Sequence, residues 1–149
     1  MESPIFRYQQ VDDRIATSAQ PTPDQIPWLK AQGFDAVVNL STPTARNFVA
    51  DEARLAMDAG LAYVHAPVDC SQLEPAHYEV LRGVLRAFDG RKVLVHCAGN
   101  VKSSALVQLW RIKEKGEDRE RLTGELRALD WHEPKWFAYL DRMSGQASP

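Results

Sequence analysis

The sequence predicts an α/β protein with a central, mainly parallel sheet of four to five strands flanked by helices. Short β-branched apolar runs recur along the 149 residues, and the stretches between them repeat their apolar residues with a helical period. Strands that alternate with helices of about 10 to 15 residues form right-handed βαβ units, which build a parallel sheet. A chain of this length fits one domain, 1–149.

The first third of the chain predicts short strands and one capped helix. Residues 6–20, FRYQQVDDRIATSAQ, are typical of one or two short edge strands. In residues 21–33, PTPDQIPWLKAQG, Thr22 is a candidate N-cap with Gln25 three positions later, and Gly33 is a candidate helix end.

The rest of the chain continues the alternation. Three apolar runs, DAVVNLS, LAYVHAPV and KVLVHC, predict buried strands at 35–41, 61–68 and 92–97. Apolar residues at helical spacing predict helices at 48–59, 74–90, 104–115, 117–129 and 134–143.

Composition argues against several classes of protein. The net charge is −2 and no Lys/Arg-rich block occurs, so we expect no nucleic-acid partner. No run of about 18 apolar residues and no signal-like start are present, so we expect no membrane partner and a cytoplasmic location. Two cysteines and four scattered histidines lack metal-ligand spacing, so we expect neither a metal nor another cofactor.

The topology brings polar residues to one edge of the sheet. In a parallel sheet all the segments that follow the strands emerge at the carboxyl edge, here STPTARN, DCSQLE and CAGNVKS. We therefore expect Asp69, Cys97 and Lys102 to be neighbours there, with Arg46 as a candidate fourth member.

The turn after Cys97 has the composition of an anion site. If a strand ends at Cys97 and a helix begins near Ser103, the intervening N–H groups surround a concavity at a helix N-terminus and stabilise a thiolate there. Gly99 and Asn100 tolerate the left-handed backbone that such a loop requires. The alternative is a cysteine that only packs at the end of a buried strand. The predicted anion-binding amides are those of Ala98, Gly99, Asn100, Val101 and Lys102.

These residues resemble a known family. VLVHCAGNVKSSALVQLWR resembles the active-site loop of cysteine-dependent protein phosphatases, namely a small bacterial group similar to dual-specificity phosphatases with one residue fewer than Cys-x5-Arg. IATSAQPTPDQI, AVVNL, YVHAPVD and WHEPKWFAYL are similar to further stretches of that group. The resemblance implies a parallel sheet flanked by helices, no metal, and hydrolysis of a phosphorylated protein or small phosphomonoester.

The resemblance also implies residue roles. Cys97 would attack phosphorus to form a phosphocysteine, His96 would help to set the thiolate, and the loop amides would hold the phosphoryl oxygens. Asp69 would protonate the leaving group and then activate water. Ser104 falls where the family places a hydroxyl that assists breakdown of the phosphoenzyme, and Ser103 is the less favoured candidate.

Lys102 departs from the family, because it occupies the position of the phosphate-gripping arginine. A guanidinium is a planar fork with two parallel donors, whereas an ammonium is a hydrated point charge. Loss of one charge-assisted bond of about 1.5 to 3 kcal/mol slows a reaction roughly 10- to 100-fold. Arg46 could supply a second positive charge, although a solvated loop arginine is the favoured interpretation.

Three further hypotheses stay open. A rhodanese-like sulfurtransferase also places a cysteine before a turn of amides, but it needs no acid loop. A catalytically impaired pseudophosphatase would bind phosphorylated partners without turnover. Cys70 and Cys97 could also form a reversible disulfide that protects the nucleophile.

Overall fold

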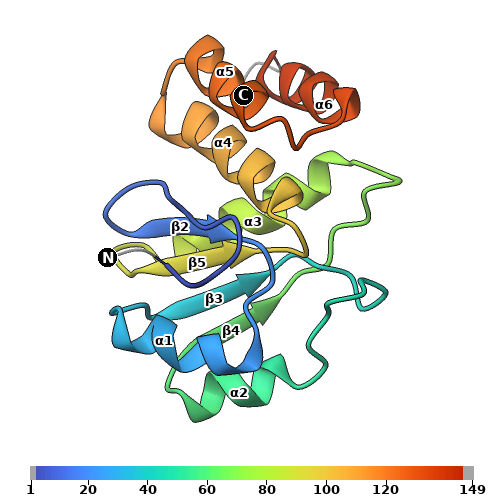
Figure 1. The fold of residues 1–149 in the computed structure, drawn as a ribbon. Helices are drawn as coiled ribbons and strands as arrows, with labels where there is room; N and C mark the ends of the chain where they lie inside the picture. The colour runs from blue at the N-terminus through green and yellow to red at the C-terminus, as the bar shows by residue number, and fades with distance from the viewer. Residues whose placement is uncertain (1–2, 146–149) are drawn as a thin grey trace.

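The computed structural model describes residues 3–145 as one five-stranded sheet surrounded by helices (Figure 1). The order of the strands across the sheet is β1-β2-β5-β3-β4. The strands are β1 (Gln9–Gln10), β2 (Ile15–Ser18), β3 (Ala36–Asn39), β4 (Ala62–His65) and β5 (Val93–His96). The helices are a 3₁₀ turn η1 (Pro23–Gln25), α1 (Ile26–Ala31), α2 (Glu52–Asp58), α3 (Pro75–Ala87), α4 (Val101–Lys115), α5 (Arg119–Leu129) and α6 (Pro134–Gly145).

The sheet is mainly parallel, which confirms the predicted fold class. β2, β5, β3 and β4 pair in parallel, and only β1 runs antiparallel, against β2. The prediction of edge strands in residues 6–20 is correct for β1 and wrong for β2. All four residues of β2 are buried because β2 lies between β1 and β5.

Side chains alternate between two hydrophobic clusters, one on each face of the sheet. In β5, Val93 and Val95 pack in the cluster with α3, α4 and α6, while Leu94 packs in the cluster with α1 and α2. In β3, Val38 and Val37 divide in the same way. This alternation follows from the two-residue repeat of a strand, and it explains why both strands read as continuous apolar runs.

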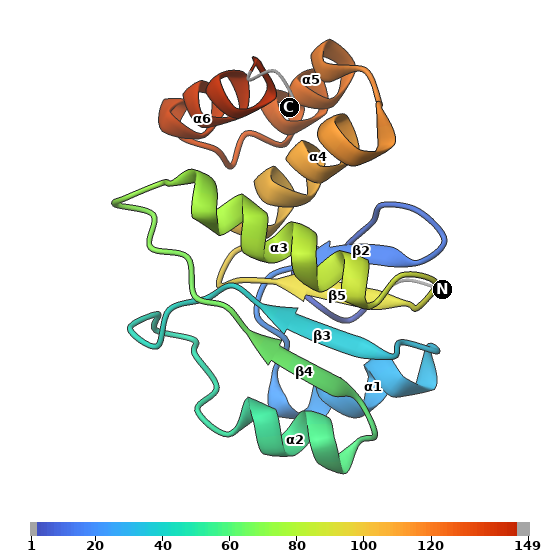
Figure 2. The ribbon, with the colours of Figure 1, turned by 180° about the vertical axis from the view of Figure 1, so that it is seen from behind.

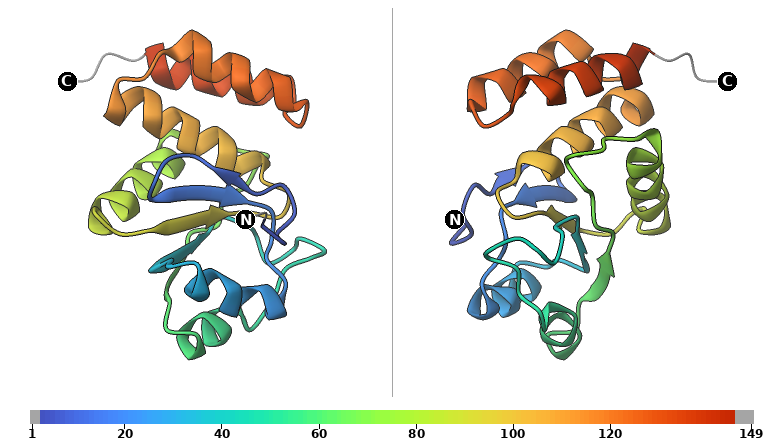
Figure 3. Two further views of the ribbon diagram at one scale, coloured as in Figure 1. Left: turned by 60° about the vertical axis from the view of Figure 1, so that its left-hand side comes forward. Right: turned by 90° about the vertical axis from the view of Figure 1, so that its right-hand side faces the viewer.

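Helices cover both faces of the sheet. Figure 3 shows α1 and α2 on one side and α3 and α4 on the other, with α5 and α6 stacked beyond α4. In Figure 2 the parallel strands point the same way, so the loops that follow β3, β4 and β5 emerge together at one edge.

Two helix starts differ from the prediction, and both border this edge. α2 begins at Glu52 rather than at residue 48, because Phe48 lies in the loop and packs its ring 5.5 Å from the His65 ring. α4 begins at Val101 rather than near Ser103, so the turn after Cys97 is shorter than expected.

In the part of the chain from 3 to 145, no helix has both the length and the apolar character needed to cross a bilayer.

Candidate active site

The loop between β5 and α4 is tied down from outside through its carbonyl oxygens. The Ala98 carbonyl accepts hydrogen bonds from the Gln20 N–H at 3.2 Å and from the Asn47 amide at 3.0 Å. The Gly99 carbonyl accepts from the Arg7 guanidinium at 3.1 Å. The next two carbonyls accept from the Ser104 hydroxyl.

The outward carbonyls fix the direction of the loop N–H groups. In a planar trans peptide the C=O and N–H bonds point in opposite directions. With the Ala98 carbonyl held by Gln20 and Asn47, the Gly99 N–H points the other way. The N–H groups at the start of α4 lack partners within the helix, so they supply donors to an anion.

Asn100 makes the sharp turn into the helix. It has φ 62° in the left-handed region, and its side-chain amide donates to the Arg7 carbonyl at 2.7 Å and to the Thr17 hydroxyl at 3.1 Å. The expectation that Gly99 shares this conformation is wrong. Gly99 instead pairs with Ala19 in an isolated antiparallel bridge, which needs extended backbone.

Cys97 lies at the base of the loop beside Ser103. The Cys97 side chain is 2% exposed, and its sulfur lies 3.3 Å from the Ser103 Oγ. Ser103 also donates to the Asn100 Oδ1 at 2.6 Å. The preference for Ser104 as the hydroxyl next to the sulfur is therefore wrong, because Ser104 Oγ binds the Asn100 carbonyl and lies 2.9 Å from His132 Nε2. One residue along α4 turns the side chain by about 100°.

His96, at the end of β5, is fully buried and binds an acidic residue that sequence reasoning missed. Its Nε2 lies 2.6 Å from Glu52 Oε2, and these two side chains are 0% and 1% exposed. Its Nδ1 lies 3.3 Å from the Cys97 carbonyl. Glu52 Oε1 accepts a short hydrogen bond from the Gln20 amide. Removal of one member of such a buried pair typically costs about 3 to 5 kcal/mol.

Asp69 lies in the exposed loop between β4 and α3. Its Oδ1 accepts hydrogen bonds from the Ser71 N–H at 2.9 Å and from the Ser71 hydroxyl at 2.8 Å. Both bonds lower the pKa of Asp69, and the bond from the Ser71 N–H has the larger effect. The positive charge of Lys102 lowers this pKa further. Lys102 is half-buried and within electrostatic reach of Asp69 and Cys70, so the loops after β4 and β5 meet as predicted.

Cys70 sits next to Asp69 as a half-buried free thiol, and Cys97 is also free. Burial raises the pKa of Cys70, and the charge of Lys102 opposes that rise. A disulfide between the two thiols stays a prediction, which mass spectrometry of peroxide-treated protein tests.

α6 holds the loop that carries Asp69. Lys135 donates to the Cys70 carbonyl at 3.1 Å, and the Tyr139 hydroxyl donates to the Glu74 carbonyl at 2.9 Å. The C-terminal helix therefore fixes the acid loop at two points, one on each side of its exposed tip.

The loop after β3 contributes Asn47 rather than Arg46. Asn47 donates to the Ala98 carbonyl, whereas Arg46 is exposed beside it. Arg46 is thus in the loop that borders the site, as a solvated residue.

Arg7 and His132 brace the loop from its outer side. Arg7 has φ 54°, a left-handed conformation that is unfavourable for a residue with a side chain, and its guanidinium stacks 4.4 Å from the centre of the Trp131 ring. His132 Nε2 lies 3.1 Å from the Val101 carbonyl. Burial lowers the pKa of His132, so the ring is held neutral.

The residues that sequence reasoning missed share one feature: each acts through a contact far along the chain. Gln20 and His132 lay within stretches that carried the family resemblance, and Asn47 lay in a segment expected at the carboxyl edge of the sheet, whereas no motif pointed to Arg7 or Glu52. The missed residues are Arg7, Gln20, Asn47, Glu52 and His132.

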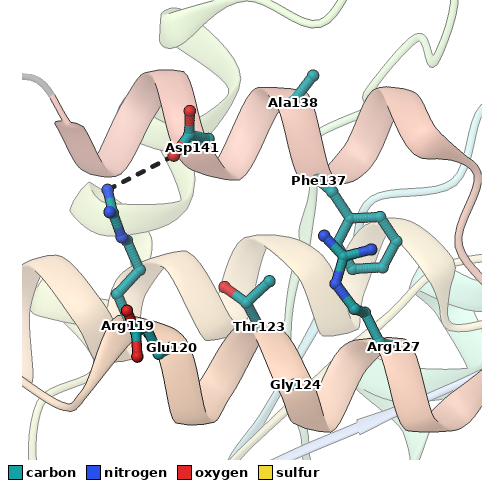
Figure 4. A pocket seen from close by; sticks show the side chains of 8 residues that line it. All are labelled: Arg119, Glu120, Thr123, Gly124, Arg127, Phe137, Ala138 and Asp141. Carbon is teal, nitrogen blue, oxygen red and sulfur yellow. Dashed lines mark ion pairs between the residues drawn. The ribbon is translucent and has the colours of Figure 1, made fainter.

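A separate surface hollow of about 490 Å³ lies between α5 and α6, away from the Cys97 loop (Figure 4). Arg119 pairs with Asp141 across it at 3.6 Å, and Arg127 stacks on the Phe137 ring. Within residues 3–145, no three His, Cys, Asp or Glu side chains gather as a metal site would need.

An anion-binding loop with a cysteine at its base, on the carboxyl edge of a parallel sheet, is the arrangement expected of cysteine-dependent phosphatases, and the family comparison decides between them and rhodanese-like enzymes. The family described as DSP-PTPase phosphatase fused to NAD+ kinase matches residues 6–135, and the chain belongs to this family. The family and the structural neighbours point to a phosphatase, that is, a hydrolase with a cysteine nucleophile.

Solved structures of other proteins are also similar to this chain. A candidate phosphatase of the DUF442 group from Shewanella putrefaciens CN-32 is 30% identical, with a TM-score of 0.85 over 95% of this chain and 93% of its own. TpbA from P. aeruginosa, solved with phosphotyrosine, is 19% identical and shares the fold, with a TM-score of 0.70 over 99% of this chain and 93% of its own.

A curated relative is longer than this chain. The beta-lactamase hydrolase-like protein of Xylella fastidiosa (strain 9a5c) is 28% identical over 145 residues, which make up 95% of this chain and 33% of that protein. The chain thus spans about a third of the length of this relative.

Proposed function

We propose that the protein hydrolyses phosphomonoesters through a phosphocysteine intermediate on Cys97. The observation that carries the proposal is the loop geometry: residues outside the loop hold the Ala98 and Gly99 carbonyls, and the cysteine lies at the base of a loop that ends at the N-terminus of α4. A phosphate is the anion that such a loop and helix N-terminus accommodate.

The reaction has two balanced steps. In the first, the Cys97 thiolate attacks phosphorus, the S–P bond forms, the bond to the leaving oxygen breaks, and Asp69 gives that oxygen its proton. In the second, Asp69 takes a proton from water, the water oxygen attacks phosphorus, and the S–P bond breaks to release phosphate and the thiolate. Ser103, next to the sulfur, supports the thiolate in both steps by turning its hydroxyl proton from Asn100 Oδ1 to the sulfur.

Lys102 supplies the positive charge at the position where the family has arginine. As an ammonium it neutralises the phosphoryl charge without the second parallel hydrogen bond, so we expect a slow enzyme. A phosphorylated protein, such as one bearing phosphotyrosine, or a small phosphomonoester is the proposed substrate.

Hydrolysis of a small aryl phosphate by wild type, Cys97→Ser and Asp69→Asn tests this function. Wild type is expected to turn over, Cys97→Ser to be inactive, and Asp69→Asn to lose about 10²- to 10⁴-fold. Equal activity of wild type and Cys97→Ser would exclude Cys97 as the nucleophile.

The two alternatives give different outcomes in matched assays. A rhodanese-like enzyme would transfer sulfur from thiosulfate to cyanide and leave the aryl phosphate intact. A pseudophosphatase would bind phosphate in both wild type and Cys97→Ser without turnover, and only Lys102→Arg would create activity.

A further inference from the structure

The strongest unassigned feature of the site is the buried contact between His96 and Glu52. Both side chains are fully enclosed, and Glu52 reaches the end of β5 from the first turn of α2. The reaction proposed above uses neither carboxylate oxygen of Glu52, so the cost of burying this charge calls for a reason.

Hydrogen bonding fixes where the protons are. The His96 Nδ1 faces the Cys97 carbonyl, which only accepts, so this contact is a hydrogen bond only when Nδ1 carries a proton. The Gln20 amide nitrogen donates to both the Pro21 carbonyl and Glu52 Oε1, so Oε1 is an acceptor. One proton remains for the short contact between His96 Nε2 and Glu52 Oε2.

The surroundings favour the charged arrangement of this proton. The carboxylate is stabilised by the Gln20 amide and by the nearby Tyr63 hydroxyl. We propose that Glu52 is a positioning residue that holds His96 as an imidazolium beside Cys97 and so raises the thiolate fraction of that cysteine.

The other titratable groups around the pair do not compete for this role. Burial raises the pKa of Tyr63 to about 12, the hydrogen bond from Asn39 lowers it, and the charge of Glu52 raises it, so the phenol stays protonated. The other titratable groups near Cys97 are Asp69 and Cys70, in the loop after β4, and Lys102, in the first turn of α4.

Glu52→Gln isolates the charge from the hydrogen bonds. The new amide can donate to a neutral His96 Nε2 and accept from Gln20, so the packing and the bond to the Cys97 carbonyl are retained. Only the carboxylate charge and the shared proton are lost. Asp58→Asn is the matched control, because it removes an exposed carboxylate from the far end of α2, where Asp58 pairs with Arg54.

The pH dependence of Cys97 alkylation by iodoacetamide, followed by mass spectrometry, tests the proposal. We expect Glu52→Gln to move the midpoint up by about one pH unit, which makes alkylation about tenfold slower below both midpoints. Asp58→Asn is expected to leave the midpoint in place. An unchanged midpoint in Glu52→Gln, with a lowered melting temperature only, would overturn the positioning role.

A second measurement uses only the wild-type protein, so it does not depend on whether Glu52→Gln folds. Nitrogen-15 NMR of wild type at pH 7 is expected to show both ring nitrogens of His96 protonated, and a neutral ring would overturn the proposal. The role of the thiolate as nucleophile rests on the proposed function, but neither experiment uses a substrate. If wild type does not hydrolyse phosphomonoesters, the proposed function is wrong, but the inference about Glu52 is unaffected.

Discussion

The Cys97 sulfur lies 3.3 Å from the Ser103 hydroxyl, and that hydroxyl is itself held by the Asn100 side chain at 2.6 Å. The hydroxyl has a single proton, which it gives to Asn100 Oδ1, so its oxygen faces the Cys97 thiol as an acceptor. It can stabilise the thiolate only when that proton turns from Asn100 to the sulfur. Asn100, which makes the turn into α4, therefore also fixes the position of the Ser103 hydroxyl beside the sulfur.

Ser103→Ala is expected to lower kcat about fivefold and to change KM little, because one hydrogen bond of about 1 kcal/mol to the sulfur is lost. Steady-state hydrolysis of an aryl phosphate measures this. Ser104→Ala is the control, since its hydroxyl binds backbone carbonyls and His132 instead. A larger loss in Ser104→Ala than in Ser103→Ala would contradict the geometry.

Lys102→Arg is expected to raise kcat/KM roughly 10- to 100-fold, because a guanidinium adds a second, parallel hydrogen bond to the phosphoryl group. Lys113→Arg provides the matched control on the same helix, where the ammonium binds the Met143 carbonyl near α6. If Lys102→Arg leaves kcat/KM unchanged, Lys102 does not grip the substrate.

Ser71→Ala is expected to move the alkaline limb of the pH–rate profile to higher pH. The Ser71 hydroxyl is one of the two donors that lower the pKa of Asp69. Without it that pKa rises, and the acid stays protonated to a higher pH. The profile of kcat/KM for phenyl phosphate, which has a poor leaving group, reports the shift. If the alkaline limb of the profile stays in place, Asp69 is not the group that donates the proton to the leaving oxygen.

The protein is expected to lose stability as the pH falls below about 6.5, in part through His132. Burial lowers the pKa of this ring below its unfolded value of 6.5, so the unfolded chain binds the proton more readily. The stabilisation is complete above 6.5 and declines as the pH falls toward the folded pKa. Urea unfolding at pH 7.5 and 5.5 should show a smaller pH effect in His132→Gln than in wild type. His77→Gln, at the start of α3, should retain the wild-type effect, and an equal loss in all three proteins would exclude His132.

The alternation of apolar runs was sufficient to predict the layers of the fold. Val93 to Val95 and Ala36 to Val38 are continuous apolar runs because helices cover both faces of the sheet. The alternation did not predict that β2 is an inner strand, because its polar residues Thr17 and Ser18 are typical of an edge strand. Both are buried between β1 and β5. The helix starts at Glu52 and Val101 also differed, because loop contacts rather than propensity decide where each begins.

The sequence by itself determined that Cys97 follows a buried strand, that Asp69 shares its sheet edge, and that Lys102 stands where a guanidinium is usual. The first two properties follow from local composition and from the common direction of parallel strands, and the third from the resemblance of the loop to the phosphatase family. Tertiary structure alone decided that Ser103 rather than Ser104 meets the sulfur, and that Glu52 meets His96 across 44 residues. The physical reason is that the phase of a helix and the burial of a charge depend on contacts between segments distant in the chain.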